Sequence, residues 1–197
     1  RQGGAANRPG TQFITGVKDS SKNVLLVPFE FDDTQTYMLE FGDFYIRFIA
    51  QGVPISISTP AAWSAVTAYT VGDLVSLGGV NYYATAASTN QNPLSGIGWY
   101  ALTGSIYEIP TPYAYADLPN LSYNQSADVL TLVHKNYPPK ELSRFANTRW
   151  ILSDISFTPT IASVTNLHNN GTAGFVKNGW SVTAISATGE ESFPQVT

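Results

Sequence analysis

The sequence predicts an all-β fold on three observations. Apolar and polar side chains alternate with a period of two in several stretches, whereas helical periodicity is almost missing. Turn-forming pairs that contain glycine separate these stretches. Hydrophobic residues make up 43% of the 197 residues and charged residues only 12%, which is not the composition of a disordered chain. We therefore expect antiparallel meanders, some of them like propeller blades, together with small additional β modules.

Charge and composition narrow the possible functions. The formal net charge is −4 and the ten Lys and Arg residues are spread along the chain, so no basic patch is expected for nucleic acid or an anionic membrane. The absence of Cys excludes disulfides, thiolate nucleophiles and cysteine-bound metals. No apolar run approaches the roughly 20 residues of a membrane span. Because the chain begins with Arg1, we expect it to be a piece of a longer polypeptide.

The first four strands are expected before residue 60. The stretch VLLVPFEF (24–31) places alternate apolar residues on one face, and TYMLEFGDFYIRF (36–48) alternates on both sides of a Gly-Asp pair. We interpret this pair as a two-residue hairpin turn in which Gly42 supplies the positive φ. Gln51-Gly52 is expected to form the next turn. These signals together predict an antiparallel meander.

A second group of strands is expected later in the chain. In ADVLTLVH (127–134) both faces carry apolar side chains, which predicts a strand that is buried on both faces. Pro138 and Pro139 lack N–H groups and are expected to end that pairing, so that the next strand starts near Leu142. A further turn leads into RWILSDISF (149–157). This succession of strands and turns predicts a sheet of the kind found in a propeller blade.

The same region contains Asp128, His134 and Ser143, the residue types of a catalytic triad. A nucleophilic serine needs its base within hydrogen-bond reach, and in many hydrolases it lies on a G-x-S-x-G turn beside an oxyanion hole. Ser143 is expected on a strand with neither feature nearby, so we predict no catalytic residues and no enzymatic activity. His134 is instead expected at a strand end, bonded to the turn backbone, and Asp128 in a turn.

No cofactor or metal site is predicted either. Asp32-Asp33 and Glu190-Glu191 are adjacent pairs, and neighbouring side chains of an extended chain point to opposite faces. His168 has no second histidine near it, and no phosphate-binding glycine motif is present. The residues therefore give no acid–base dyad and no ligand set.

Four segments of the chain have amino-acid sequences that are specific enough to indicate a family. They are RQGGAANRPGTQFI (1–14), LLVPFEFDDTQTYMLEFGDFYIRF (25–48), TPYAYADLPNLSYNQSADVLTLVHKNYPPKELSR (111–144) and TRWILSDISF (148–157). In this order, and over about half of the chain, they resemble the N-terminal part of the tail tubular protein B, or nozzle, family of short-tailed bacteriophages.

This resemblance implies a virion structural protein that is rich in β-sheet, has propeller-like parts and has no enzymatic activity. Proteins of this family work as a ring below the portal, through which DNA passes. The implied partners are other copies of the chain, neighbouring tail or adaptor proteins and, transiently and non-specifically, phage DNA, with no membrane and no cofactor. The implied location is the virion tail, after synthesis in the cytoplasm of a bacterial host.

A second pattern lies between these segments. It runs through Trp63, Tyr69, Gly72, Asp73, Val75, Tyr82, Pro93 and Trp99. On these residues the stretch 61–102 resembles a small chitin-binding module of the carbohydrate-binding 5/12 kind. Sugar-binding members carry a tandem Trp where this chain has Ala86-Ala87. We therefore interpret Trp63 and Trp99 as the small core that closes a module of about forty residues.

The alternative interpretation is a carbohydrate-binding module that contributes to adsorption on the host surface. The possible glycan contacts are then Trp63, Tyr82, Tyr83, Trp99 and Tyr100. A coplanar, solvent-facing aromatic pair among these residues would favour sugar binding. Buried rings would favour the structural interpretation.

The sequence thus predicts three parts. They are a discontinuous β domain (1–59 and 103–157), an inserted carbohydrate-binding-like module (60–102) and a C-terminal β segment (158–197). The C-terminal segment resembles fibronectin-like or FCCH-like domains. Its first strand is expected at residues 158–166, and two more strands are expected around a Thr188-Gly189 turn.

Overall fold

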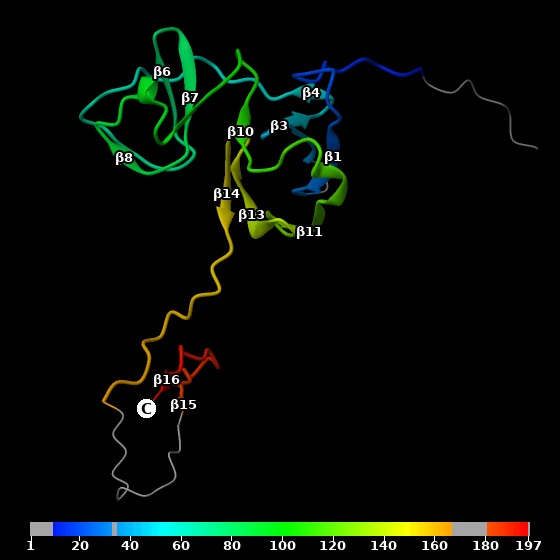
Figure 1. The fold of residues 1–197 in the computed structure, drawn as a ribbon. Helices are drawn as coiled ribbons and strands as arrows, with labels where there is room; N and C mark the ends of the chain where they lie inside the picture. Colours follow the sequence, from blue (N-terminus) through cyan, green and yellow to red (C-terminus); the bar gives the residue numbers. More distant parts are fainter. Residues whose placement is uncertain (1–9, 33–34, 167–180, 197) are drawn as a thin grey trace, which may run out of the picture. The chain divides into compact units, whose positions relative to one another are not determined.

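The all-β fold predicted from the sequence is confirmed in the computed structural model of the chain, which describes residues 10–32, 35–166 and 181–196 (Figure 1). All paired strands run antiparallel. The helical elements of the described residues are two 3₁₀ turns, η1 (Pro93–Ser95) and η2 (Leu118–Asn120). The chain divides into two units, Arg1–Ile155 and Ser156–Thr197.

The first sheet has five strands in the order β1-β2-β3-β10, with β4 paired to the other part of β3. Its strands are β1 (Leu25–Glu30), β2 (Thr36–Gly42), β3 (Tyr45–Ala50), β4 (Val53–Pro54) and β10 (Glu108–Pro110). The first four follow one another along the chain, so the predicted meander is confirmed. β10 joins only after the inserted module and pairs with β3.

The second sheet is a four-stranded meander in the order β11-β12-β13-β14. Its strands are β11 (Ser122–Ser126), β12 (Val129–His134), β13 (Tyr137–Ala146) and β14 (Arg149–Asp154). One face of β12 is buried, with Leu130 and Leu132 fully enclosed, whereas Val133 on the other face is 46% exposed. The prediction that this strand is buried on both faces is therefore wrong.

The two sheets share one hydrophobic core and form a sandwich. Trp150 of β14 lies at its centre and is fully buried. Its ring stacks on Phe48 at 4.5 Å between centroids and meets Phe29 edge-on at 4.9 Å and Tyr37 at 5.4 Å. Because the second sheet packs face to face against the first sheet, the described residues do not form the propeller that the sequence suggested.

The hairpin between β2 and β3 differs in detail from the prediction. Gly42 pairs with Tyr45, so the two turn residues are Asp43 and Phe44, and the positive φ of 63° belongs to Phe44. Gly42 is required for a different reason, since a Cβ atom there would lie 2.2 Å from the Tyr45 ring. The second predicted turn is confirmed, with positive φ at both Gln51 and Gly52.

Replacing Gly42 by alanine is expected to lower the free energy of unfolding by about 1–3 kcal/mol, because the added methyl group must displace the packed Tyr45 ring. Urea denaturation followed by circular dichroism measures the change. Gly16→Ala is the matched control, since a Cβ at Gly16 has nothing within 4 Å. Equal stability of the two variants would contradict the assigned role of Gly42.

The prolines of the second sheet do not end the strand, contrary to the prediction. β13 already begins at Tyr137 and contains both Pro138 and Pro139. The pairing of β12 with β13 is irregular at this point, between the pairs that involve Leu132 and His134. Proline is tolerated at the start of a strand and at a bulge, where no ladder N–H is needed.

The inserted module contributes two small sheets to the first unit, in the orders β6-β7-β9 and β5-β8. Its strands are β5 (Ala68–Tyr69), β6 (Leu74–Leu77), β7 (Val80–Ala84), β8 (Ser88–Thr89) and β9 (Trp99–Ala101). The module has its own core of Val75, Tyr82, Ala84 and Trp99. Trp63 and Tyr69 pack against this core.

Among the described residues of the second unit, β15 (Ser181–Val182) pairs with β16 (Gln195–Val196). Gly189 has a φ of 86° and its N–H donates to the Ser186 carbonyl, so the predicted turn is present. The predicted strand at 158–166 is wrong, because these residues have no ladder partner. The predicted His168 loop lies outside the described residues.

Candidate interaction surface

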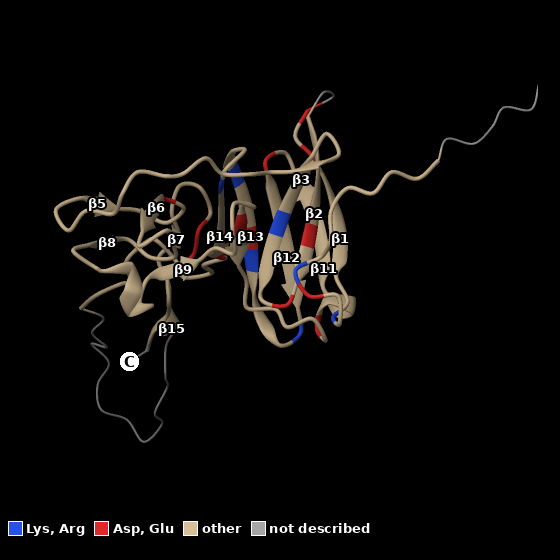
Figure 2. Cartoon of the chain, turned by 90° about the horizontal axis from the view of Figure 1, so that it is seen from above, with Lys and Arg blue, Asp and Glu red and all other residues tan. Residues whose placement is uncertain are grey.

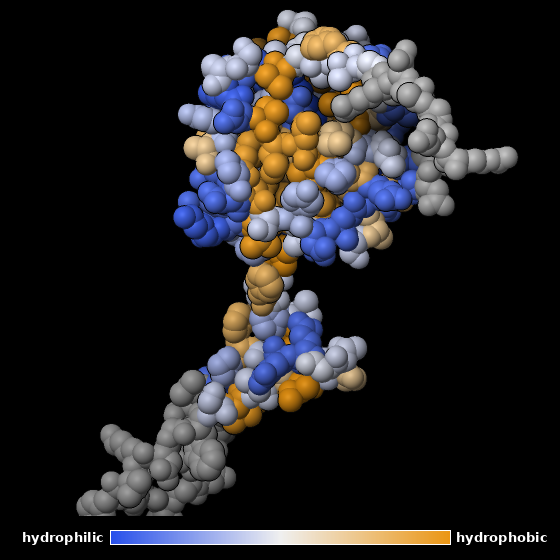
Figure 3. Space-filling model, turned by 90° about the vertical axis from the view of Figure 1, so that its right-hand side faces the viewer, coloured by the Kyte–Doolittle hydropathy of each residue, from blue (hydrophilic) through white to orange (hydrophobic). Residues whose placement is uncertain are grey.

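The outer face of the first sheet, which points away from the shared core, carries a groove of about 470 Å³. Its apolar wall consists of Ile14, Val17, Val24, Leu26, Met38 and Ile49. Leu26 on β1 is 52% exposed, which leaves a large apolar side chain open to solvent. A band of hydrophobic side chains is visible on the side of this unit where β1 lies (Figure 3). Exposed apolar surface that is grouped in this way is typical of interaction surfaces.

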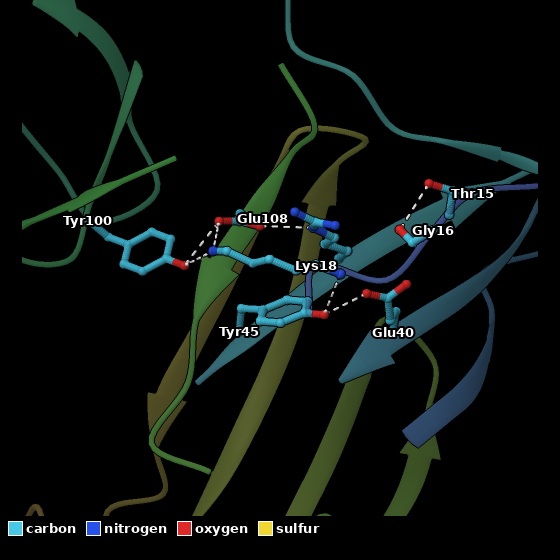
Figure 4. Close-up of polar contacts among 8 residues, drawn as sticks. Thr15, Gly16, Lys18, Glu40, Tyr45, Tyr100 and Glu108 are labelled. Atoms are coloured by element: carbon cyan, nitrogen blue, oxygen red, sulfur yellow. Dashed lines mark hydrogen bonds and ion pairs between the residues drawn. The ribbon is translucent and has the colours of Figure 1, made fainter. Parts of the chain in front are cut away.

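A charge cluster lies at one end of the groove on the same face. It contains Lys18, Glu40, Tyr45, Arg47, Tyr100 and Glu108, and all of these except Arg47 are labelled in Figure 4. The carboxylate of Glu108 is fully buried and accepts hydrogen bonds from Lys18 Nζ at 2.6 Å and from Arg47 Nε at 2.9 Å. The strands of this chain carry few charged side chains (Figure 2). A buried carboxylate with two cationic partners is therefore unusual in this chain.

The Tyr45 hydroxyl links Lys18 to the groove. It accepts a hydrogen bond from the Lys18 backbone N–H at 3.4 Å and donates one to Glu40 Oε1 at 2.8 Å. Burial raises the pKa of Tyr45 above its usual range, and the hydrogen bond to Glu40 raises it further. Tyr45 therefore remains a hydrogen-bond donor at neutral pH. Both the backbone and the side chain of Lys18 are held, which fixes the segment before β1 on the outer face.

Tyr100 brings the inserted module into the same cluster. Its hydroxyl donates to Glu108 Oε1 at 3.1 Å and accepts from Lys18 Nζ at 3.2 Å. Burial raises the pKa of Tyr100, and the negative charge of Glu108 adds to the shift. The cluster thus ties together the segment before β1, the first sheet and the module.

The three residues of the suspected triad do not meet. Val129 pairs with Ser143 and His134 pairs with Tyr137, so Ser143 and His134 are separated by five residues of strand, or about 16 Å. His134 Nδ1 accepts the Asn136 N–H at 3.2 Å, which confirms the predicted bond to the turn backbone. Asp128 lies in the turn before β12, as predicted. No proton relay can join these groups.

The five aromatic residues considered for glycan contact do not form an exposed platform. Tyr82, Tyr83 and Trp99 are at most 7% exposed, and Trp63 packs against the module core. Trp99 meets Tyr69 edge-on at 5.2 Å. Tyr100 is engaged in the charge cluster. This arrangement is the one expected for a structural use of the rings.

Tyr83 has a distinct role, because its ring belongs to the core of the sandwich and its hydroxyl donates to the Trp150 carbonyl at 2.8 Å. Tyr83→Phe is expected to lower the free energy of unfolding by about 1–2 kcal/mol, since it leaves a buried carbonyl without this partner. Chemical denaturation of the full chain measures the loss. Tyr82→Phe is the control, because the Tyr82 hydroxyl makes no hydrogen bond among the described residues; an equal loss in both variants would refute the assigned bond.

Within the described ranges, no group of three or more His, Asp or Glu side chains is placed to hold a metal ion. The same residues contain no helix that is long and apolar enough to cross a membrane. The groove and the charge cluster are therefore the features of the first unit that most need a functional explanation.

Comparison with known proteins adds no relative to this description. No protein-family model matches the chain, and no curated protein matches it significantly. The assignment to a family accordingly depends on the sequence segments quoted above.

Proposed function

We propose that the chain is a structural component of a bacteriophage tail, a nozzle-like ring subunit that acts through subunit assembly and the passage of DNA. The observation that supports this proposal best is the place of three of the four family-like segments in the fold. Segment 25–48 supplies β1 to β3, and segments 111–144 and 148–157 supply β11 to β14. The resemblance therefore covers most strands of the two sheets that share one core, but not β4 and β10.

The outer face supports an assembly role. A groove with a mostly apolar wall is suited to bury against a neighbouring protein, and a segment held down by Lys18 gives this surface a fixed shape. Carbohydrate binding is the weaker alternative, because three of the five aromatic rings that it would use are buried.

The proposal is tested on phage particles purified from the source by density gradient. An antibody against the chain is expected to detect it in the particles by immunoblot, and immunogold electron microscopy is expected to place it at the tail. A non-structural protein made during infection serves as the negative control. A chain that is present in infected cells but missing from the particles would refute the proposal.

A further inference from the structure

The groove ends at a buried carboxylate that is only partly satisfied. Glu40 is 2% exposed and lines the groove together with the apolar residues. Its Oε1 accepts the Tyr45 hydroxyl, which is the one hydrogen bond that the carboxylate receives from the described residues, so its second oxygen stays open toward the groove. Arg47 is directly opposite Glu40 on β3, but its Nε is committed to Glu108. In the described part of the chain, no cation forms an ion pair with Glu40.

This arrangement favours the binding of a cation that another molecule supplies. A carboxylate that is almost enclosed and has no cation in an ion pair with it is costly, and a single neutral hydroxyl compensates its charge incompletely. The wall beside it, formed by residues such as Met38 and Ile49, suits an aliphatic chain. A lysine side chain combines both properties, since its methylene stem packs on apolar surface while its ammonium group donates up to three hydrogen bonds.

We propose that the outer-face groove binds an apolar segment of a partner protein and that a lysine of this segment reaches Glu40. The inference rests on the proposed assembly function, because it names the chemistry of the partner at the surface through which that function is exerted. Apolar residues on either side of the lysine would cover the exposed Leu26 and Met38.

A different protein fits the groove better than a second copy of this chain. A second copy would have to offer a free lysine, and the exposed Lys135 lies in a turn between His134 and Asn136 and not in an apolar segment. Most described cations are also already in ion pairs, namely Lys18, Lys22, Arg47, Lys140 and Arg149. Arg144 lies over the Phe31 ring at 3.8 Å.

The chain offers a specific probe for this site. Met38 is its only methionine and lines the groove, so one methyl resonance of a chain labelled with ¹³C at the methionine methyl reports on occupancy. The ligand probe is a capped pentapeptide, acetyl-Val-Leu-Lys-Leu-Val-amide. Its matched control replaces lysine by norleucine, which keeps the aliphatic stem and removes the charge.

The Met38 methyl resonance is expected to shift saturably with the lysine peptide. The dissociation constant is expected to be at least about fivefold larger for the norleucine peptide, because the charge-assisted hydrogen bond is lost. Glu40→Gln should remove this preference while keeping the shape of the groove. If Glu40→Gln does not fold, the comparison of the lysine and norleucine peptides on the unchanged chain still tests the proposal.

Equal affinities for the two peptides, or no shift with either, would overturn the inference. A Met38 shift that depends on protein concentration alone, and is lost in Glu40→Gln, would identify a second copy as the occupant and overturn the choice of partner. Either result can occur while the chain is found in phage tails, so failure of this inference is distinguishable from failure of the proposed function.

Discussion

Trp150→Ala is expected to lower the free energy of unfolding by about 3–5 kcal/mol, because it removes the largest fully buried side chain of the described residues. The indole is fully buried and contacts aromatic rings from three strands of the opposite sheet. Its removal leaves a cavity where both sheets and the module meet, because Tyr83 of the module donates to the Trp150 carbonyl. Urea unfolding followed by far-ultraviolet circular dichroism measures the loss.

Phe145→Ala is the matched control for this experiment. Phe145 is also an aromatic residue of the second sheet, but its side chain is 61% exposed, so its replacement should change stability by less than about 1 kcal/mol. A loss below about 1.5 kcal/mol in Trp150→Ala would show that the sheets do not share the core described above.

The second large effect is expected from the charge cluster. Glu108→Gln should cost about 3 kcal/mol of unfolding free energy, because it leaves the Arg47 guanidinium, 6% exposed, without its charged partner. Denaturation at neutral pH in low and high salt measures the cost, and salt should change it little because the pair is buried. Asp154→Asn is the control, since its pair with Lys140 is largely solvent-exposed on the aspartate side.

A double variant separates pairing from packing at this position. Arg47→Met combined with Glu108→Leu removes both buried charges and should recover about 2 kcal/mol relative to Glu108→Gln. Equal stability of the single and double variants would mean that the buried charges do not interact strongly.

Local patterns were sufficient to predict four of the five strands of the first sheet, whereas β10 was not predicted. Alternation through residues 24–48 identified which side chains face the core, and Val27, Phe29 and Phe48 are buried accordingly. Turn chemistry was less reliable, because a Gly-Asp pair in the sequence does not reveal the register. The positive φ fell on Phe44, since the close approach of Tyr45 to Gly42 sets the pairing one position later.

The candidate interaction surface could be predicted only in part. Once β2 and β3 pair as a hairpin, Glu40 must face Arg47, and charged residues within such apolar strands are a signal in a chain with 12% charged residues. Glu108 and Lys18 were not foreseeable, because they are 90 residues apart and are joined by tertiary packing. The groove was not predictable for the same reason. One of its walls is the segment before β1, and this segment has no periodic pattern that would place it on the sheet.

The two ends of the inserted module come together at its base, where the Ile57 N–H donates to the Ser105 carbonyl at 2.8 Å. A short linker could therefore replace the intervening stretch without straining the backbone of the sandwich. Such a shortened protein would nevertheless lose the hydroxyls of Tyr83 and Tyr100, which satisfy groups on Trp150 and Glu108. The inserted module therefore stabilises the sandwich through these two hydrogen bonds. Replacing it by a different domain would require two tyrosines at matching positions.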